Sequence, residues 1–177
     1  SALTDARNRA AMLHDMQRDF EGFSRSVKSV MQQASRGGLS GVHGPVSALL
    51  STENRFVTAI DTALGASASS IVVGSAEDGR ACIEYLRRTD GARATFLPLD
   101  TIRPASLRES GLDRERGCCG TADTLVQFDE TYGAVVRSLL ARTVVCENMD
   151  AALALARSRG HRFRIVTLDG QIIQPGG

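Results

Sequence analysis

The first part of the chain carries apolar residues at alternating spacings of three and four, which is typical of a coiled-coil seam or of one face of an amphipathic helix. Most of the intervening side chains are polar, so the opposite face would meet water. The seam has one polar interruption and consists of Leu3, Ala6, Ala10, Leu13, Gln17 and Phe20. A second set at helical spacing ends at the turn of residues 35–38 and consists of Phe23, Val27, Val30, Met31 and Ala34.

From Gly41 onward the pattern occurs twice. The first copy aligns with the second without a gap at an offset of 76 residues, from Gly41 with Gly117 to Leu64 with Leu140. Two later stretches align at shorter offsets, Val72-Val73 with Val144-Val145 at 72 and Phe96-Leu97 with Ile165-Val166 at 69. The offset shrinks where loops are expected, so two copies of one supersecondary unit are the simplest explanation.

Each copy predicts the same order of helix, strand, helix and strand. The expected helices are residues 55–64, 76–88, 131–142 and 149–159, and the expected strands are residues 71–73, 94–97, 143–146 and 164–168. Strands that alternate with helices predict an α/β or α+β layer architecture with at least some parallel pairing. The segment between the copies carries Pro104, Gly111 and four arginines, which predicts an exposed and mobile linker.

The final stretch, Arg164 to Gly177, reads RIVTLDGQIIQPGG. An apolar strand runs into an Asp-Gly pair, which favours a tight turn, and a second apolar pair, Ile172-Ile173, follows. The strand half repeats the first copy, whereas residues 172–177 have no counterpart there. Terminal residues that pack against nothing tend to fray, so we expect the chain to continue beyond its last two glycines.

Composition narrows the class of protein. The chain has 177 residues and 42% hydrophobic content, enough for one ordinary core or two small lobes. No apolar run approaches the roughly 18 residues that span a bilayer, and no signal peptide is visible, so we expect a soluble protein without membrane contact. Four cysteines are too few and too scattered for a disulfide framework, which favours a reducing compartment. A net charge of +1 does not by itself indicate a polyanionic partner.

Several motifs in this order resemble one family, the hinge domain of structural maintenance of chromosomes (SMC) proteins. They are EGF with VKSV near the start, then GVHGPVSALL, FVTAIDTALG, SIVV, RATFLPLDTIRP, ALALA and RIVTLDGQIIQPGG. Together they cover nearly all of residues 20–177. Each motif alone is weak, but their common order and spacing make the resemblance specific.

The resemblance implies an α/β hinge fold of two pseudo-repeated lobes behind the end of an arm coiled coil. The expected division is the arm helix at 1–36, lobe I at 37–100, a linker at 101–116 and lobe II at 117–177. The implied function is dimerisation of a chromosome-organising ATPase that acts in chromosome condensation and partitioning, with weak DNA binding that ignores sequence. The implied partners are a second copy, DNA and accessory condensin-type subunits, and the implied location is the cytoplasm, in association with the nucleoid.

For the dimer interface, the resemblance points to the end of lobe II, where strands of two subunits would approach closely and glycine would let them do so. The interface candidates are Gly170, Ile172, Ile173, Gly176 and Gly177. For Gly170 a simple hairpin turn is an equally good interpretation. The matched glycines at 41, 44, 117 and 120 favour a tight turn before each lobe over an interface role.

Arginines cluster at the ends of the second helix of each copy and are the candidates for phosphate contacts: Arg87, Arg88, Arg157, Arg159 and Arg162. Such contacts would not read sequence and would weaken with salt. For each single residue, a solvated cation that complements the helix dipole is the slightly better interpretation.

No catalytic residue, metal site or cofactor is expected from the sequence. Adjacent Cys118 and Cys119 lack the spacing of zinc ligands relative to the three histidines, so we interpret them as structural. A phosphate-binding GxxxxGK[ST] loop is absent from the sequence, so ATP hydrolysis is expected only in head domains of the parent protein. The alternative is a stand-alone two-lobed α/β enzyme or small-molecule regulatory domain that clasps a ligand between its lobes.

Overall fold

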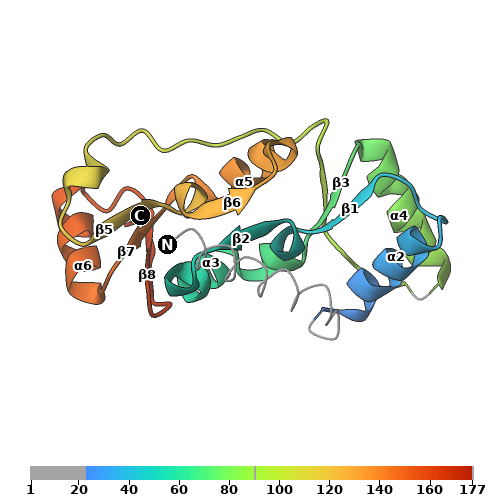
Figure 1. Ribbon diagram of the computed structural model, residues 1–177, viewed down its shortest axis with the longest axis horizontal. Helices are drawn as coiled ribbons and strands as arrows, with labels where there is room; N and C mark the ends of the chain where they lie inside the picture. Colours follow the sequence, from blue (N-terminus) through green and yellow to red (C-terminus); the bar gives the residue numbers. More distant parts are fainter. Residues whose placement is uncertain (1–22, 90, 177) are drawn as a thin grey trace.

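The computed structural model describes residues 23–89 and 91–176, and Figure 1 shows an elongated molecule with two sheet-containing ends joined by a middle layer. The expected seam from Leu3 to Phe20 lies outside the described residues. The second helical set forms helix α2 (Arg25–Ser35), which begins where the Ser24 hydroxyl accepts a hydrogen bond from the Val27 amide. A polar N-cap of this kind satisfies one of the amides that the first helical turn leaves unpaired.

The two copies of the repeat fold alike. The first copy comprises strands β1 (Val42–Pro45), β2 (Leu50–Thr52), β3 (Ile71–Val73) and β4 (Phe96–Pro98) with helices α3 (Val57–Leu64) and α4 (Ala76–Thr89). The second comprises β5 (Cys118–Thr121), β6 (Val126–Phe128), β7 (Thr143–Cys146), β8 (Arg164–Thr167) and β9 (Ile172–Ile173) with helices α5 (Gly133–Leu140) and α6 (Met149–Ser158). Short 3-10 turns lie at residues 46–48, 54–56, 65–69, 112–114, 122–125 and 130–132. The predicted α/β architecture of two pseudo-repeated lobes is thus confirmed.

Each lobe has its own sheet, and a third sheet joins the lobes. The first sheet has the order β1-β3-β4 and the second the order β5-β7-β8-β9, while β2 pairs with β6 in a two-stranded ribbon at the centre. Within each lobe the first pair is antiparallel and the second is parallel. The expected parallel pairing is therefore present, and the central β2–β6 ribbon links the two copies.

Strand register corrects the sequence alignment by one residue. Val72 lies opposite Gly44, and Val145 lies opposite the equivalent Gly120, so the offset at this strand is 73 residues and not 72. The packing agrees, because Val72 and Val145 both face the central core whereas Val144 faces the core at the end of lobe II. Two adjacent valines in each strand allowed either alignment, and side chains one residue apart face opposite sides of a sheet.

The matched glycines hold the entry to each lobe. Gly41 and Gly117 have φ of 72° and 75°, and Gly44 and Gly120 have φ of 131° and 118°, a region that side chains other than glycine rarely adopt. Each sheet has a register irregularity at this place, as expected for a β-bulge. The prediction that these glycines meet a structural demand of the repeat is confirmed.

Three apolar clusters fill the molecule. The central cluster is made by both copies, with Ile60 and Leu64 of α3 packed with Val136 and Leu140 of α5. One end cluster joins α2 and α4 to the first sheet, and the other joins α6 to the second sheet. The sheet of each lobe has the central cluster on one face and an end cluster on the other. Its inner strand is therefore a continuous apolar run, as in Ile71–Val73.

Candidate functional site

The last strands of lobe II form the terminal hairpin, which we define as β8, β9 and the turn between them. Val166 lies opposite Ile172 and Ile165 opposite Ile173 in antiparallel register. The turn is fixed by Thr167, whose amide donates to the Gln171 carbonyl at 2.9 Å and whose hydroxyl accepts from the Gln171 amide at 2.9 Å. The Asp169-Gly170 turn expected from the sequence is therefore present.

Strand β9 is the outer strand of the second sheet. Ile173 turns inward onto the end cluster of lobe II, whereas the Ile172 side chain is 43% exposed. An edge strand presents unpaired backbone groups that can pair with another chain. The two predicted isoleucines thus lie on a sheet edge, with one side chain anchoring the strand and the other directed to solvent.

The predicted glycines contact their own chain. Gly170 has a φ of 87°, and a Cβ built on it would lie 3.1 Å from Thr62 Oγ1 and 3.2 Å from Thr58 Cγ2 of helix α3. The Gly176 amide donates to the His161 carbonyl at 2.9 Å, and a Cβ on Gly176 would lie 3.1 Å from His161 Cβ. Glycine was expected here because it lets another backbone come close. The close neighbours of Gly170 and Gly176 belong to the same chain. Gly177 lies outside the described residues.

A second edge lies at the opposite end of the molecule. Strand β4 is the outer strand of the first sheet, and Ile83 of the neighbouring helix α4 is 40% exposed. Two adjoining cavities of about 480 and 400 Å3 share a wall made by Ile83, Arg87, Ala94 and Phe96. We call this surface the β4 groove. The sequence alone did not lead us to predict this groove. Ile83 lies off the buried face of α4, which carries Gly79, Cys82 and Leu86, and an apolar residue at that position could have indicated it.

The five predicted DNA-contacting arginines fall into two groups. Arg87 and Arg88 lie in the last turn of α4 with exposed side chains, and Arg157 is exposed on α6. Arg162 is 63% exposed and pairs with Glu109 at 3.1 Å. The structure does not bring the α4 pair and the α6 group together, because they belong to opposite ends of the molecule (Figure 1).

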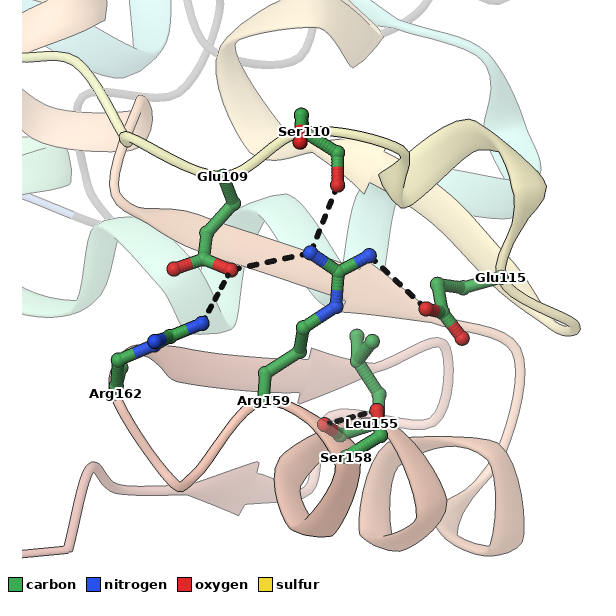
Figure 2. Close-up of polar contacts among 7 residues, drawn as sticks. All are labelled: Glu109, Ser110, Glu115, Leu155, Ser158, Arg159 and Arg162. Atoms are coloured by element: carbon green, nitrogen blue, oxygen red, sulfur yellow. Dashed lines mark hydrogen bonds and ion pairs between the residues drawn. The ribbon is translucent and has the colours of Figure 1, made fainter.

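Arg159 has a different environment. Its side chain is only 17% exposed, and its two terminal nitrogens contact Glu109 at 3.2 Å, Glu115 at 2.9 Å and the Ser110 carbonyl at 2.8 Å (Figure 2). The hydrogen bond with Glu115 is the main reason why the pKa of Arg159 is raised, and the bond with Glu109 acts in the same direction. These bonds occupy the guanidinium and tie α6 to the segment between the lobes.

That segment is anchored rather than loose. It passes along one side of the molecule from lobe I to lobe II (Figure 1), and its Leu112 is buried in the end cluster of lobe II together with partly buried Leu107. Leu99 and Ile102 pack against the central cluster. The expectation of an exposed linker is therefore correct for its polar side chains but wrong for its leucines and for Glu109, which is 8% exposed.

Among the described residues, no group of three or more histidine, cysteine or acidic side chains is placed to hold a metal ion. None of the helices in the part of the chain that the structure describes is both long and apolar enough to cross a membrane. The terminal hairpin and the β4 groove offer backbone edges and apolar side chains, and the exposed arginines offer positive charge.

Comparison with known proteins identifies the family. The sequence profile described as SMC proteins Flexible Hinge Domain matches residues 39–156. The chromosome partition protein Smc of Bacillus subtilis (strain 168) is 42% identical over 175 residues, covering 97% of this chain and 15% of that protein. The protein of the same name from Methanocaldococcus jannaschii is 38% identical over 152 residues, covering 86% of this chain and 13% of that protein. The chain therefore spans about a seventh of the length of these relatives.

Solved structures agree with this match. An asymmetric dimer of the Geobacillus stearothermophilus SMC hinge domain has a TM-score of 0.85 at 39% identity, covering 97% of this chain and 70% of that one. The Pyrococcus furiosus SMC hinge domain has a TM-score of 0.70 at 26% identity, covering 96% of this chain and 89% of that one.

Proposed function

Because this chain belongs to the family of SMC protein hinge domains, we propose that it is a dimerisation hinge and that its subunit contact is made by the terminal hairpin. The observation that carries the proposal is the exposed edge of β9 with the Ile172 side chain directed to solvent. The similarity to a hinge domain that forms a dimer supports it.

The surface that receives β9 is the β4 groove of the second subunit. Edge strand β4 offers backbone groups for pairing, and Ile83 and Phe96 offer an apolar wall for Ile172. Two different patches that meet under two-fold symmetry give two identical contacts, β9 to the partner's β4 and β4 to the partner's β9, and the assembly closes as a dimer. Two short edges each become protected in this way.

Replacing Ile172 with aspartate tests the contact. The substitution removes the apolar contact of Ile172 and forces a carboxylate to lose its water on binding. We therefore expect the dimer dissociation constant to rise at least about tenfold. Analytical ultracentrifugation of the variant and the parent measures it. The matched control is Leu153→Asp on α6, an apolar residue of similar exposure at 37%, which should leave the constant unchanged. Equal effects of the two substitutions would contradict the proposal.

Complementation distinguishes β4 from other receptors. Ile83→Asp alone should weaken the dimer as Ile172→Asp does, because every contact then contains one damaged surface. A mixture of the two variants can form a dimer in which one contact holds both lesions and the other is intact. The mixed dimer should therefore be tighter than either homodimer. A mixture no tighter than its components would place the receptor of β9 elsewhere.

Sequence-independent DNA binding is a second part of the proposal and rests on the exposed Arg87 and Arg88. Because Arg87 also lines the β4 groove, the dimer constant of the charge-reversed variant is measured beside its DNA binding. Reversing both charges with Arg87→Glu and Arg88→Glu should weaken binding at low salt and make the logarithmic salt dependence shallower by about 1.8, the value for two lost phosphate contacts. A gel shift titration at several salt concentrations measures both quantities.

The matched control reverses two exposed arginines between the lobes, Arg114→Glu and Arg116→Glu, which changes the net charge equally. Its loss should be smaller, because only the long-range field changes and no phosphate contact disappears. Equal losses in the two double variants would show that Arg87 and Arg88 make no local contact. Arg159 is left out of this proposal because its bonds to Glu109 and Glu115 occupy it.

For the whole protein we propose the role that the relatives' name indicates, chromosome partition. On this proposal the hinge joins two arms of an ATPase whose heads lie outside this chain, accessory condensin-type subunits bind that parent complex, and the complex works in the cytoplasm on the nucleoid. The hinge itself supplies association and carries out no reaction.

A further inference from the structure

Two thiols lie directly opposite each other at the entry to lobe II. In the antiparallel pair of β5 and β7, Cys118 is the register partner of Cys146, and the Glu147 amide next to it donates to the Gly117 carbonyl at 2.8 Å. This neighbouring bond makes Cys118 and Cys146 a pair without mutual backbone hydrogen bonds. In such pairs the Cα atoms are about 4.5 Å apart and the side chains approach closely. A disulfide needs Cα atoms about 4.4–6.8 Å apart, so a pair of this kind has a spacing that a disulfide can bridge.

Lobe I provides an internal comparison. Its equivalent pair is Val42 opposite Val73, and the equivalent backbone bond, from the Gly74 amide to the Gly41 carbonyl, is also 2.8 Å. The repeat therefore requires only two apolar side chains of moderate size at this place. Lobe II meets that requirement with thiols at both positions, and both are free in this structure. The fold alone does not demand a thiol at either position.

The two thiols also differ in a way that suits oxidation. They share a hydrogen bond, which is the main reason why the pKa of Cys118 is lowered to about 7 and the pKa of Cys146 is raised, and burial further raises the latter. Cys118 is only partly buried, and its neighbour Gly117 lines a surface cavity of about 460 Å3. Cys118 is thus the more readily ionised and the more accessible member of the pair, and the thiolate is the form that reacts. Buried Cys82, whose pKa burial raises to about 11, is the opposite case.

We propose that Cys118 and Cys146 are a site of reversible oxidation, at which a hydroperoxide converts the pair into an intramolecular disulfide across β5 and β7. The Cys118 thiolate attacks one peroxide oxygen, the O–O bond breaks, and the released hydroxide takes up the proton lost by Cys118 and becomes water. The resulting sulfenic acid is then attacked by the Cys146 sulfur, the S–O bond breaks, and a second water leaves with the Cys146 proton. Two thiols lose two electrons in total, and hydrogen peroxide is reduced to two waters.

The disulfide closes the chain between β5 and β7, which includes the β6 strand and helix α5 at the centre of the molecule. A crosslink that closes a loop restricts the unfolded chain, so the oxidised form should unfold at a higher temperature than the reduced form. The inference concerns lobe II alone and holds whether or not the chain dimerises.

The test treats the full chain with hydrogen peroxide, alkylates the remaining thiols and maps the peptides by mass spectrometry. We expect one disulfide, Cys118 to Cys146, that dithiothreitol reverses, and a rate of formation that rises as the pH passes through about 7 because the thiolate fraction rises. Four alkylated thiols, a bond between Cys118 and Cys119, or a bond between two molecules would each overturn the proposal.

The matched variant places the lobe I residues in lobe II, Cys118→Val together with Cys146→Val. It should fold with an unchanged dimer constant, form no disulfide and show no increase of Tm on treatment with peroxide. The Cys119→Ala and Cys82→Ala variants should still form the bond, and its loss in either would overturn the assignment. If the double valine variant does not fold, the peptide map of the parent chain still shows whether the Cys118–Cys146 disulfide forms.

Discussion

Replacing Gly170 with alanine should lower the free energy of unfolding by about 2–3 kcal/mol, from a backbone conformation that disfavours a Cβ together with overpacking at a filled site. The glycine has a φ of 87°, and the new Cβ would meet Thr62 Oγ1 at 3.1 Å and Thr58 Cγ2 at 3.2 Å. The Thr62 side chain is restrained, because its hydroxyl donates to the Thr58 backbone carbonyl at 2.8 Å on the same helix. Urea unfolding of the variant and the parent measures the difference.

Gly37 is the matched control for this substitution. Its φ is 80°, close to that of Gly170, yet a Cβ there would have no atom within 4 Å, so Gly37→Ala should cost only the backbone strain, about 1 kcal/mol. The difference between the two variants isolates the contact of the terminal hairpin with α3. If Gly170→Ala folds as stably as Gly37→Ala but loses the dimer, the glycine serves the partner subunit and not its own helix. That outcome would reverse our interpretation of this residue.

Elements with strong periodicity were predictable from the sequence. The spacing of apolar residues placed α4 and α6 to within a residue or two, and the valine-rich runs placed β3 and β7. Strands β1, β2, β5 and β6 were missed, because each has only three or four residues and because β1 and β5 contain a glycine, which does not favour a strand. Their pairing depends on residues more than twenty positions away, as in β2 with β6, which no local pattern shows.

The sequence directed attention to only one part of the candidate site, the terminal hairpin, and it did not predict the contacts there or the β4 groove. The unmatched residues 172–177 directed attention to β9, and the structure places that strand at a sheet edge. The sequence could not show that Gly170 and Gly176 already contact Thr62 and His161 of their own chain. It also could not separate Arg159 from Arg157, since both lie near the end of one helix and differ only in the face they occupy. Burial of the receiving carboxylate, Glu109, depends on how the segment between the lobes folds back.

Replacing Arg159 with methionine should release that segment from lobe II. Methionine retains much of the aliphatic packing but removes the bonds to Glu109, Glu115 and the Ser110 carbonyl. The Glu109 side chain is 8% exposed and would be left with Arg162 as its remaining ion-pair partner of those shown in Figure 2. Removing one partner of a poorly hydrated ion pair is costly because the other charge stays behind. We expect local opening of the segment, with only part of the effect extending to global unfolding.

Trypsin measures this opening directly, because the segment carries cleavable bonds after Arg108, Arg114 and Arg116. Cleavage there should become about tenfold faster or more in Arg159→Met, since it follows the population of the open form. Arg162→Met is the matched control: it removes an arginine that contacts the same carboxylate, but its side chain is 63% exposed, so its effect should be small. Adding Glu109→Gln to Arg159→Met should recover part of the protection, because a neutral amide costs less to bury than an unpaired carboxylate. If the double variant is cleaved as fast as the single one, the anchor depends on Glu115 and Leu112 rather than on the Arg159–Glu109 pair.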